Sequence, residues 1–345
     1  MSMRVYRENL LAAFQEGDRF EIECWPEKGT VVQMGSRLQK AIAKKVSYQL
    51  RVANSSPSQV VHFLDHSSGY LIPRVPRDRK IVATLHDLIP LRFPGGLSEN
   101  QVERFRKTVS YLKECDAVVS VSEYSKREAI ELIGLREEQI HVVPNGVTAP
   151  RELKARCQEI GRLREAGAQV VVLSIGSLQE RKNLRILPGA LKAFQQETGL
   201  KAGLLRVGPL LDASLSAEIQ KVCEPGCFLE AGRLSESSLW QAYQSCDMVI
   251  VPSFYEGFGL PVIEALACGK GVAASSQSSL PEVGGEWAEY FNPDSEEEAG
   301  RALARLVPAI NVTSIEVSRK EAVQGLTWRK HLEGLYQVYE SVLAG

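Results

Sequence analysis

Short runs of β-branched residues alternate with longer stretches of helical periodicity along most of this chain. Apolar runs predict strands at 60–64, 80–85, 117–121 and 141–143, and again at 170–175, 204–207, 248–251 and 272–274. Between them, apolar residues that recur every three or four positions predict helices, for example at 99–113, 125–132, 184–197 and 237–246. This alternation is typical of an α/β protein whose parallel sheets are covered by helices on both faces.

A turn signal divides the chain near residue 148. The segment 143–147 reads VPNGV and Pro150 follows it, and Pro, Asn and Gly together favour a turn or hinge. A chain of 345 residues with 44% hydrophobic residues is long enough for two domains, each with its own core. We therefore expect two domains that meet at this segment.

The opening of the chain departs from the usual doubly wound pattern. Such a domain begins with a buried strand and a Gly-rich turn, whereas here a helix-like pattern at 6–14 comes first. Two explanations stay open. Either the first domain lacks its opening strand, or the sequence begins inside a longer reading frame.

Charge and cysteine content exclude several classes of protein. The 41 basic and 42 acidic residues give a net charge of -1, which removes the usual electrostatic basis for a nucleic-acid partner. No run approaches the roughly 18 to 20 apolar residues that span a bilayer, and the first residues lack a signal-peptide core. We therefore expect a cytoplasmic protein with reduced thiols. Cys223 and Cys227 lack a second ligand pair at zinc-finger spacing, which favours ordinary thiols over a metal site.

The densest chemical pattern lies at 248–269. A strand leads through a turn with two glycines into a helix, for which Pro261 suits the first position. Glycines before a helix N-terminus let backbone N–H groups approach an anion, and the helix dipole favours phosphate there. Glu264 is expected on the first helical turn, where it is placed to accept ribose hydroxyls. Glu256 precedes the helix, placed to meet a group beyond the phosphates.

With these motifs the sequence resembles the retaining glycosyltransferases of the GT-B fold, and specifically glycosyltransferase family 4, the mannosyltransferase-like group. The resemblance covers nearly the whole chain. Its motifs are TLHDLIPLRFP (84–94), VSEYSKREAIELIG (121–134), HVVPNGV (141–147), SIGSLQERKNL (174–184), LRVG (205–208), GRLSESSLWQAYQSCDMVIVPSFYEGFGLPVIEALACG (232–269) and SSLPEVGG (278–285).

The resemblance implies two Rossmann-like domains that face a cleft. Residues 1–148 would form the acceptor-side domain, with a C-terminal helix at 327–345 packing back on it, and 149–326 the nucleotide-sugar-binding domain. The implied enzyme is a retaining, metal-independent hexosyltransferase that needs no cofactor. It would move a mannose or glucose type of hexose from a GDP- or UDP-hexose to a glycan or lipid-linked acceptor in cell-surface polysaccharide synthesis. The sequence does not specify the oligomeric state.

By the same resemblance, Glu256 lies next to the transferred sugar as a catalytic residue, together with His86, and Glu264 binds the ribose. Arg181 and Lys182 follow a strand and a Gly-containing turn, and a paired guanidinium and ammonium suits a diphosphate clamp. The implied donor-binding set is Arg181, Lys182, Leu234, Gly257, Phe258, Gly259, Leu260 and Glu264. Many relatives carry Arg directly after the glycine of this turn, where this chain has Ser177, so we expect fewer phosphate contacts there.

Two His-Asp pairs follow strands of the first domain. Asp65 and His66 come after 60–64, and His86 and Asp87 end 80–85. Because sites in open parallel sheets form beyond the carboxyl ends of strands, we expect both pairs on the acceptor side. Two His and two Asp also suit a metal, but they lack the spacing of a known metal motif, and the resemblance implies none. His62, inside a strand, is expected to be structural.

Two other functions stay open. A catalytically silent nucleotide-sugar-binding subunit would fit the absence of an opening strand and Gly-rich turn. A transferase peripheral to the inner face of the membrane would use the basic helix 99–113 to contact anionic headgroups, although a solvated charged face is the simpler interpretation. The basic residues of that helix are Arg104, Arg106, Lys107 and Lys113.

Overall fold

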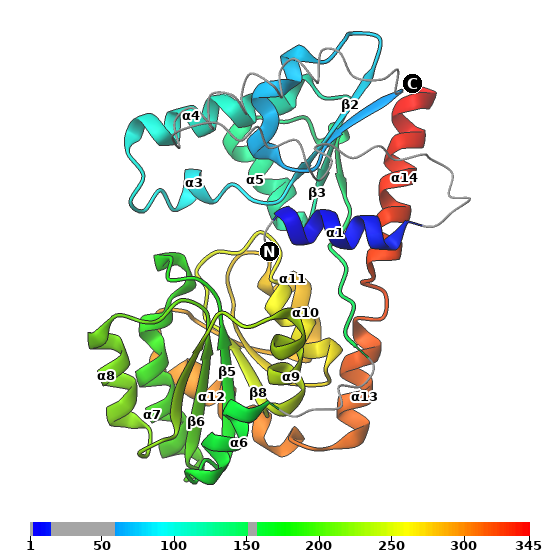
Figure 1. Ribbon diagram of the computed structural model, residues 1–345. Coiled ribbons are helices and arrows are strands. Elements are labelled where there is room, and N and C mark those ends of the chain that lie inside the picture. The colour runs from blue at the N-terminus through cyan, green and yellow to red at the C-terminus, as the bar shows by residue number, and fades with distance from the viewer. Residues whose placement is uncertain (1–2, 15–58, 151–156) are drawn as a thin grey trace, which may run out of the picture. The chain divides into compact units, whose positions relative to one another are not determined.

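The computed structural model describes residues 3–14, 59–150 and 157–345 (Figure 1). Two compact units divide the chain: unit 1 contains residues 1–144 and 328–345, and unit 2 contains residues 145–327. Each unit is a parallel sheet with helices packed on it, which confirms the predicted α/β class. Residues 15–58 lie outside the described part of the chain. The expectation that the first domain lacks an opening strand falls largely on these residues.

Unit 1 is built on a four-stranded parallel sheet in the order β1-β2-β3-β4. All four residues of β3 are buried, as both faces of the sheet are covered. Each strand lies within about one residue of its predicted bounds. The strands are β1 (Val60–Phe63), β2 (Lys80–Leu85), β3 (Ala117–Ser120) and β4 (Ile140–Val142).

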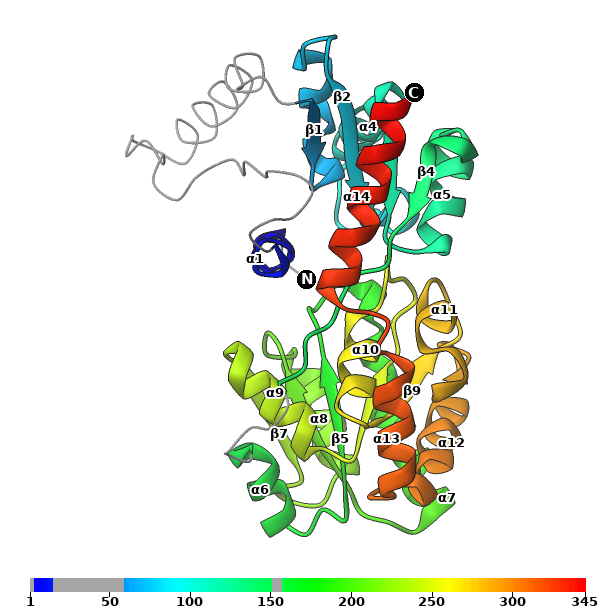
Figure 2. The ribbon, with the colours of Figure 1, turned by 90° about the vertical axis from the view of Figure 1, so that its right-hand side faces the viewer.

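Helices cover the two faces of this sheet with separate apolar clusters. One cluster includes a 3-10 helix (His66–Arg74), α4 (Glu99–Ser110) and α5 (Glu123–Ile133). The short α3 (Ile89–Arg92) precedes α4, and a second 3-10 turn (Tyr111–Glu114) ends the segment predicted as one helix. The other cluster joins α1 (Met3–Ala13) to α14 (Trp328–Ala344). The two helices pack together, and α14 runs over β2 and β3 (Figure 2).

Unit 2 is built on a six-stranded parallel sheet in the order β10-β9-β8-β5-β6-β7. The chain first builds outward from β5 to β7 and then crosses back to β8, so the strand order reverses between β5 and β8. The sequence pattern missed the two edge strands, β7 and β10, which are not fully buried. The strands are β5 (Val170–Ile175), β6 (Ala202–Val207), β7 (Phe228–Gly232), β8 (Met248–Val251), β9 (Gly271–Ser275) and β10 (Ala288–Phe291).

Eight helices of the described part of unit 2 complete its layers. The pair α7 and α12 packs closely, α10 packs on β8 and β9, and α6 packs on β5 to β7. The helices are α6 (Gln158–Glu165), α7 (Leu187–Thr198), α8 (Ala213–Val222), α9 (Glu236–Ser245), α10 (Leu260–Ala267), α11 (Leu280–Gly284), α12 (Glu296–Leu306) and α13 (Thr313–Ala322).

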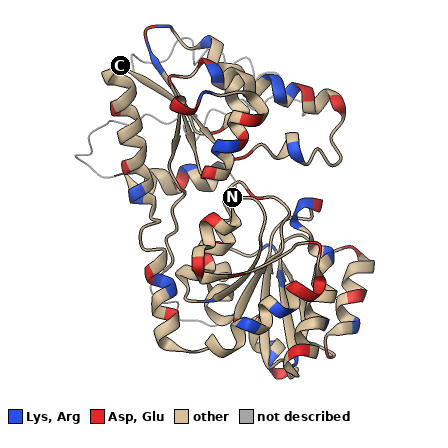
Figure 3. Cartoon of the chain, turned by 180° about the vertical axis from the view of Figure 1, so that it is seen from behind, with Lys and Arg blue, Asp and Glu red and all other residues tan. Residues whose placement is uncertain are grey.

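The surface and the thiols agree with the composition. Basic and acidic residues alternate along the elements of both units (Figure 3), and none of the described helices has the length and hydropathy of a membrane span. Every cysteine in the described ranges is a buried, unpaired thiol. Cys24 lies outside those ranges.

Candidate functional site

The carboxyl ends of β5 and β8 carry two loops that pack on each other in unit 2. These strands are neighbours in the sheet, and the strand order reverses between them, which is where open α/β sheets bind ligands. The loop after β5 holds Arg181, and the loop after β8 holds Phe254, whose backbone N–H donates to the carbonyl oxygen of Arg181 at 2.7 Å. The two segments therefore form one structural element.

Glu256 lies at the centre of this element and is only 7% exposed. Its carboxylate accepts a hydrogen bond from Arg181 Nη1 at 3.1 Å, forms an ion pair with Lys182 Nζ, and accepts from Ser253 Oγ at 2.7 Å. Arg181 also donates to the carbonyl oxygen of Tyr255 at 2.9 Å. The fold thus brings the predicted acidic residue and the predicted basic clamp into direct contact.

The charges of this cluster decide the ionisation of Glu256. Burial raises the pKa of the Glu256 carboxyl, but Lys182 and Arg181 outweigh it, and the net pKa lies below the ordinary value. Glu256 is therefore an anion at neutral pH and acts as a charge rather than as a proton donor. This anion contacts both cations of the predicted clamp.

Two serines that the sequence analysis missed fix the backbone around Glu256. Ser278 Oγ accepts a hydrogen bond from the Glu256 backbone N–H at 3.0 Å. Ser279 Oγ lies 2.9 Å and 2.8 Å from the carbonyl oxygens of Glu256 and Phe258. The positive φ of 57° at Ser278 is uncommon for a residue other than Gly. The SSLPEVGG motif was the available signal, but its contact with residue 256 arises only from tertiary packing.

The turn into α10 requires a glycine at its last position. Gly259 has φ of 105°, and a Cβ there would lie 2.8 Å from Leu280 Cδ2. The helix begins at Leu260, so Pro261 is its second residue. As a result Glu264 lies on the second turn, not on the first as predicted, because the prediction counted from the proline.

Glu264 is partly buried and has one strong partner, Tyr243 on α9. The Tyr243 hydroxyl donates to Glu264 Oε2 at 2.5 Å. Burial raises the pKa of the Glu264 carboxyl, and the hydrogen bond from Tyr243 offsets part of that rise. Tyr243 is fully buried, and nothing in the local sequence marked it as a partner of the second glutamate. Leu234 is partly buried in the loop after β7, one residue before Ser235, which caps α9.

In unit 1, His86 and His66 lie together at the carboxyl ends of β1 and β2. Their ring centroids are 6.3 Å apart, and the His86 backbone N–H donates to His66 Nδ1 at 3.3 Å. His86 Nε2 lies 2.8 Å from the carbonyl oxygen of Leu64, which only accepts, so this nitrogen carries the proton. Burial lowers the pKa of His86 to about 4, with His66 adding to the effect. His86 is therefore neutral at physiological pH.

The two aspartates of the predicted acceptor side shape their own loops. Asp65 Oδ1 accepts from the Ser67 backbone N–H at 2.8 Å, and Asp87 Oδ1 accepts from the Ile89 backbone N–H at 3.1 Å. Over 3–14, 59–150 and 157–345, no three His, Cys, Asp or Glu side chains gather as metal ligands would. His62 bonds Thr84 and Tyr339 within the core, in keeping with a structural role.

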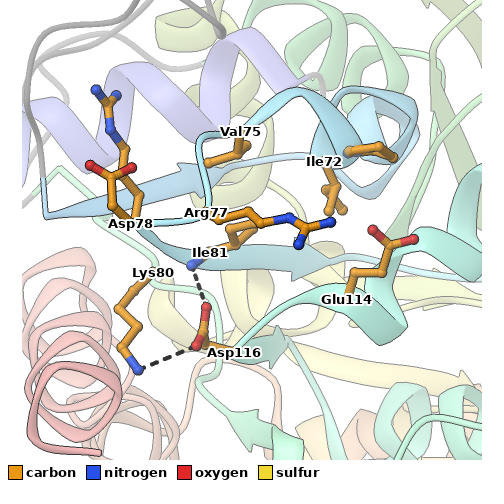
Figure 4. A pocket seen from close by; sticks show the side chains of 10 residues that line it. Ile72, Val75, Arg77, Asp78, Lys80, Ile81, Glu114 and Asp116 are labelled. Carbon is orange, nitrogen blue, oxygen red and sulfur yellow. Dashed lines mark hydrogen bonds and ion pairs between the residues drawn. The ribbon is translucent and has the colours of Figure 1, made fainter.

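A cavity of about 540 Å³ lies in unit 1, away from these histidines (Figure 4). It opens at the amino ends of β2 and β3, where Asp116 accepts from the Ile81 backbone N–H at 2.7 Å and pairs with Lys80 at 3.5 Å. His86, by contrast, follows the carboxyl end of β2. The cavity mixes charges of both signs, including Arg77 and Glu114, and is separate from the predicted acceptor side.

Comparison with known proteins assigns both halves of the chain. Residues 158–308 match the family of group 1 glycosyl transferases, and residues 11–151 match glycosyltransferase family 4. A glycosyltransferase of Methanocaldococcus jannaschii is 30% identical over 270 residues, which are 74% of this chain and 68% of the relative. O-antigen chain mannosyltransferase B of Escherichia coli is 28% identical over 238 residues, 67% of this chain. The match spans 62% of that relative, and 34% of serotype-specific mannosyltransferase WbdA of E. coli, to which 76% of this chain is 25% identical.

Solved structures share the fold at low sequence identity. Sucrose-phosphate synthase from Thermosynechococcus elongatus superposes with a TM-score of 0.73 and 20% identity over 100% of this chain and 94% of its own. HepE of Anabaena, in complex with UDP and glucose, gives a TM-score of 0.67 and 19% identity over 91% and 85%. These likenesses confirm the predicted GT-B architecture. Together with the family matches, they establish that the chain belongs to glycosyltransferase family 4.

Proposed function

We propose that this chain is a retaining, metal-independent transferase that moves a hexose from a nucleoside-diphosphate sugar to a hydroxyl of a glycan or lipid-linked acceptor. The donor would bind in residues 149–326, and the acceptor in residues 1–148 completed by 327–345. The observation that carries the proposal is the cluster of Glu256, Arg181 and Lys182 between the loops after β5 and β8.

The basic clamp is built for an anion. Arg181 and Lys182 both pair with the Glu256 carboxylate, and their side chains are only 12% and 13% exposed. A diphosphate carries more charge than a carboxylate and offers the geometry that guanidinium recognises. Donor binding would therefore draw both cations away from Glu256, and the N-terminus of α10 would add backbone N–H groups to the same anion.

Freed from the clamp, Glu256 would present its charge to the sugar. In the transfer, the bond between the sugar C1 and the diphosphate oxygen breaks, and the diphosphate leaves with the electron pair. Arg181 and Lys182 stabilise that charge where it develops. The acceptor hydroxyl forms the new bond to C1 on the same face, and its proton passes to the departing phosphate oxygen. The nearby charge of Glu256 would favour the cationic character that the sugar acquires in between.

The names of the relatives support mannose as the first sugar to test. Both E. coli relatives described above are mannosyltransferases, one of them for an O-antigen chain, which supports a role in cell-surface polysaccharide synthesis. HepE, whose structure holds UDP and glucose, makes UDP-glucose the second donor to test.

The deciding experiment is thermal unfolding with GDP, UDP and ADP, each with and without magnesium. A ligand at about 100 times its dissociation constant stabilises a protein by about 2.7 kcal/mol, so we expect one diphosphate to raise the Tm by several degrees without magnesium. The matching nucleotide sugar is then offered with candidate acceptors, and the anomeric configuration of the product is read by NMR. An inverted product would refute the same-face mechanism.

The alternative of a silent nucleotide-sugar-binding subunit predicts a different pair of results. It requires a Tm shift with a diphosphate but no transfer to any acceptor. The absence of a shift with all three diphosphates would overturn the donor site itself. A shift that depends on magnesium would overturn the metal-independent form of the proposal.

A further inference from the structure

Arg206 is a fully buried arginine at the carboxyl end of β6, with 0% of its surface exposed. A charged side chain is rarely so buried unless it is paired. Arg206 nevertheless has no carboxylate within ion-pair distance among the residues that the structure describes. Arg206 lies at the same end of the sheet as the loop after β5 that carries Arg181 and Lys182, which we call the clamp loop, but Arg206 itself is on β6.

The carboxylate on the neighbouring strand bonds to other groups instead of neutralising Arg206. Glu230 on β7 is its register partner. However, Glu230 Oε1 accepts from the Leu211 backbone N–H at 2.7 Å, and Oε2 accepts from Ser216 Oγ at 3.3 Å. Glu230 therefore holds the loop after β6 and attracts the guanidinium only from a distance.

The guanidinium bonds to neutral carbonyl groups instead. Arg206 Nη2 donates to the carbonyl oxygen of Gly176 at 2.6 Å, Nη1 donates to that of Val207, and Nε has no partner. Burial lowers the pKa of Arg206 to about 10, so the group still carries its proton at neutral pH. A buried charge without a counterion is unfavourable, and an anion bound at the neighbouring loop that carries Arg181 and Lys182 would offset part of that cost.

Gly176 connects this buried charge to the clamp. It follows β5, has φ of 149°, and begins the loop that leads to Arg181 and Lys182. Packing around it is tight, because a Cβ at Gly208 would overlap the Gly176 carbonyl oxygen and lie 2.7 Å from Arg206 Nη1. The guanidinium is therefore held against the backbone at Gly176, where the clamp loop begins.

We propose that Arg206 is a positioning residue for the donor diphosphate. Arg206 holds the turn at Gly176 by donating to the Gly176 carbonyl oxygen, and it adds a fixed positive charge on the β6 side of that turn. This inference rests on the proposed function. The positive charge on β6 would attract the same diphosphate that Arg181 and Lys182 contact directly.

The test separates the charge from the packing. Arg206→Met removes the charge and keeps most of the volume, Arg206→Lys keeps the charge, and Arg206→Gln keeps a donor for Gly176. For each variant, calorimetry gives the Kd of the diphosphate that binds the wild type best among GDP, UDP and ADP, and the Kd of the corresponding nucleoside. The ratio of the two isolates the phosphate contribution. Arg185→Met is the control, since Arg185 is 74% exposed in a surface pair with Asp212.

We expect the Met and Gln variants to weaken diphosphate binding about tenfold, which corresponds to 1.4 kcal/mol, with nucleoside binding within about twofold of the wild type. The Lys variant should keep the ratio within about threefold, and the control should leave it unchanged. Equal losses for diphosphate and nucleoside, or no loss, would overturn the inference. If neither neutral variant folds, the Lys variant decides, because a tenfold fall in its ratio contradicts a role for the charge. Failure of the wild type to bind any diphosphate would refute the proposed function instead.

Discussion

Acid should destabilise unit 1 through a buried histidine on α14. His331 is 2% exposed and uses both ring nitrogens. Nδ1 lies 2.8 Å from the carbonyl oxygen of Pro144, and Nε2 lies 2.7 Å from the Tyr6 hydroxyl. Because a carbonyl only accepts, Nδ1 carries the proton and Nε2 accepts from Tyr6. Protonation of Nε2 would place two donors against each other unless the hydroxyl turned away.

The magnitude follows from the pKa of His331. Burial lowers this pKa to about 4, against the opposing effect of the Pro144 carbonyl, whereas in the unfolded chain the pKa has its ordinary value of 6.5. A group whose pKa is lower in the folded state contributes its full stability above pH 6.5 and loses it as the pH falls toward 4. At pH 5.0, about 1.5 pH units below the unfolded value, the loss is about 2 kcal/mol at 1.36 kcal/mol per unit.

The perturbation is His331→Gln, which keeps polar atoms in the site but does not titrate. Urea unfolding at pH 7.5 and 5.0, followed by fluorescence, gives the change in unfolding free energy for both proteins. Trp328 lies 5.5 Å from the Tyr6 ring and reports on this region. The wild type should lose about 2 kcal/mol more than the variant between the two pH values, since His62 and His86 titrate in both. Equal losses would refute this account of His331.

Three further outcomes concern the site in unit 2. Glu256→Gln should lower the transfer rate at least a hundredfold, measured by steady-state kinetics. The variant should bind the nucleoside diphosphate as tightly as the wild type or more tightly, because it releases Arg181 and Lys182. Weaker binding by calorimetry would contradict a competition between Glu256 and the diphosphate for these two cations. Lys182→Met should weaken the diphosphate about tenfold and the nucleoside little, on the scale of one charge-assisted bond; an equal effect on both ligands would argue against the clamp. Tyr243→Phe should raise the KM for the nucleotide sugar about threefold to tenfold with kcat nearly unchanged, since it frees Glu264 from its partner; a loss confined to kcat would contradict a ribose role.

The sequence pattern predicted the buried strands and the local motifs well for a physical reason. Strands such as β5 are covered on both faces and therefore read as continuous apolar runs. The edge strand β7, which reads FLEAG and is nowhere fully buried, lacks that signal. Its counterpart β10 was missed for the same reason.

Site residues divided in the same way. Glu256, Arg181 and Lys182 stand in motifs that local chain order defines, so the sequence singled out each of them, whereas their ion pairs follow only from the fold. Tyr243 and Arg206 act through packing between elements distant in sequence, and a tyrosine on a helix or an arginine in a strand gives no local sign of such a partner. Only the fold identifies them.

The discontinuity of unit 1 has a consequence for the order of folding. Among the residues that the structure describes, helix α14 supplies seven of the thirteen buried ones in the cluster that covers one face of β2 and β3. Unit 2 is a single contiguous segment, so during synthesis it is complete before α14 leaves the ribosome, and domains generally fold as units as they emerge. The N-terminal unit would thus be the last to finish. A truncation at residue 327 would accordingly expose the core around Tyr6 and leave every residue of the proposed donor site in place.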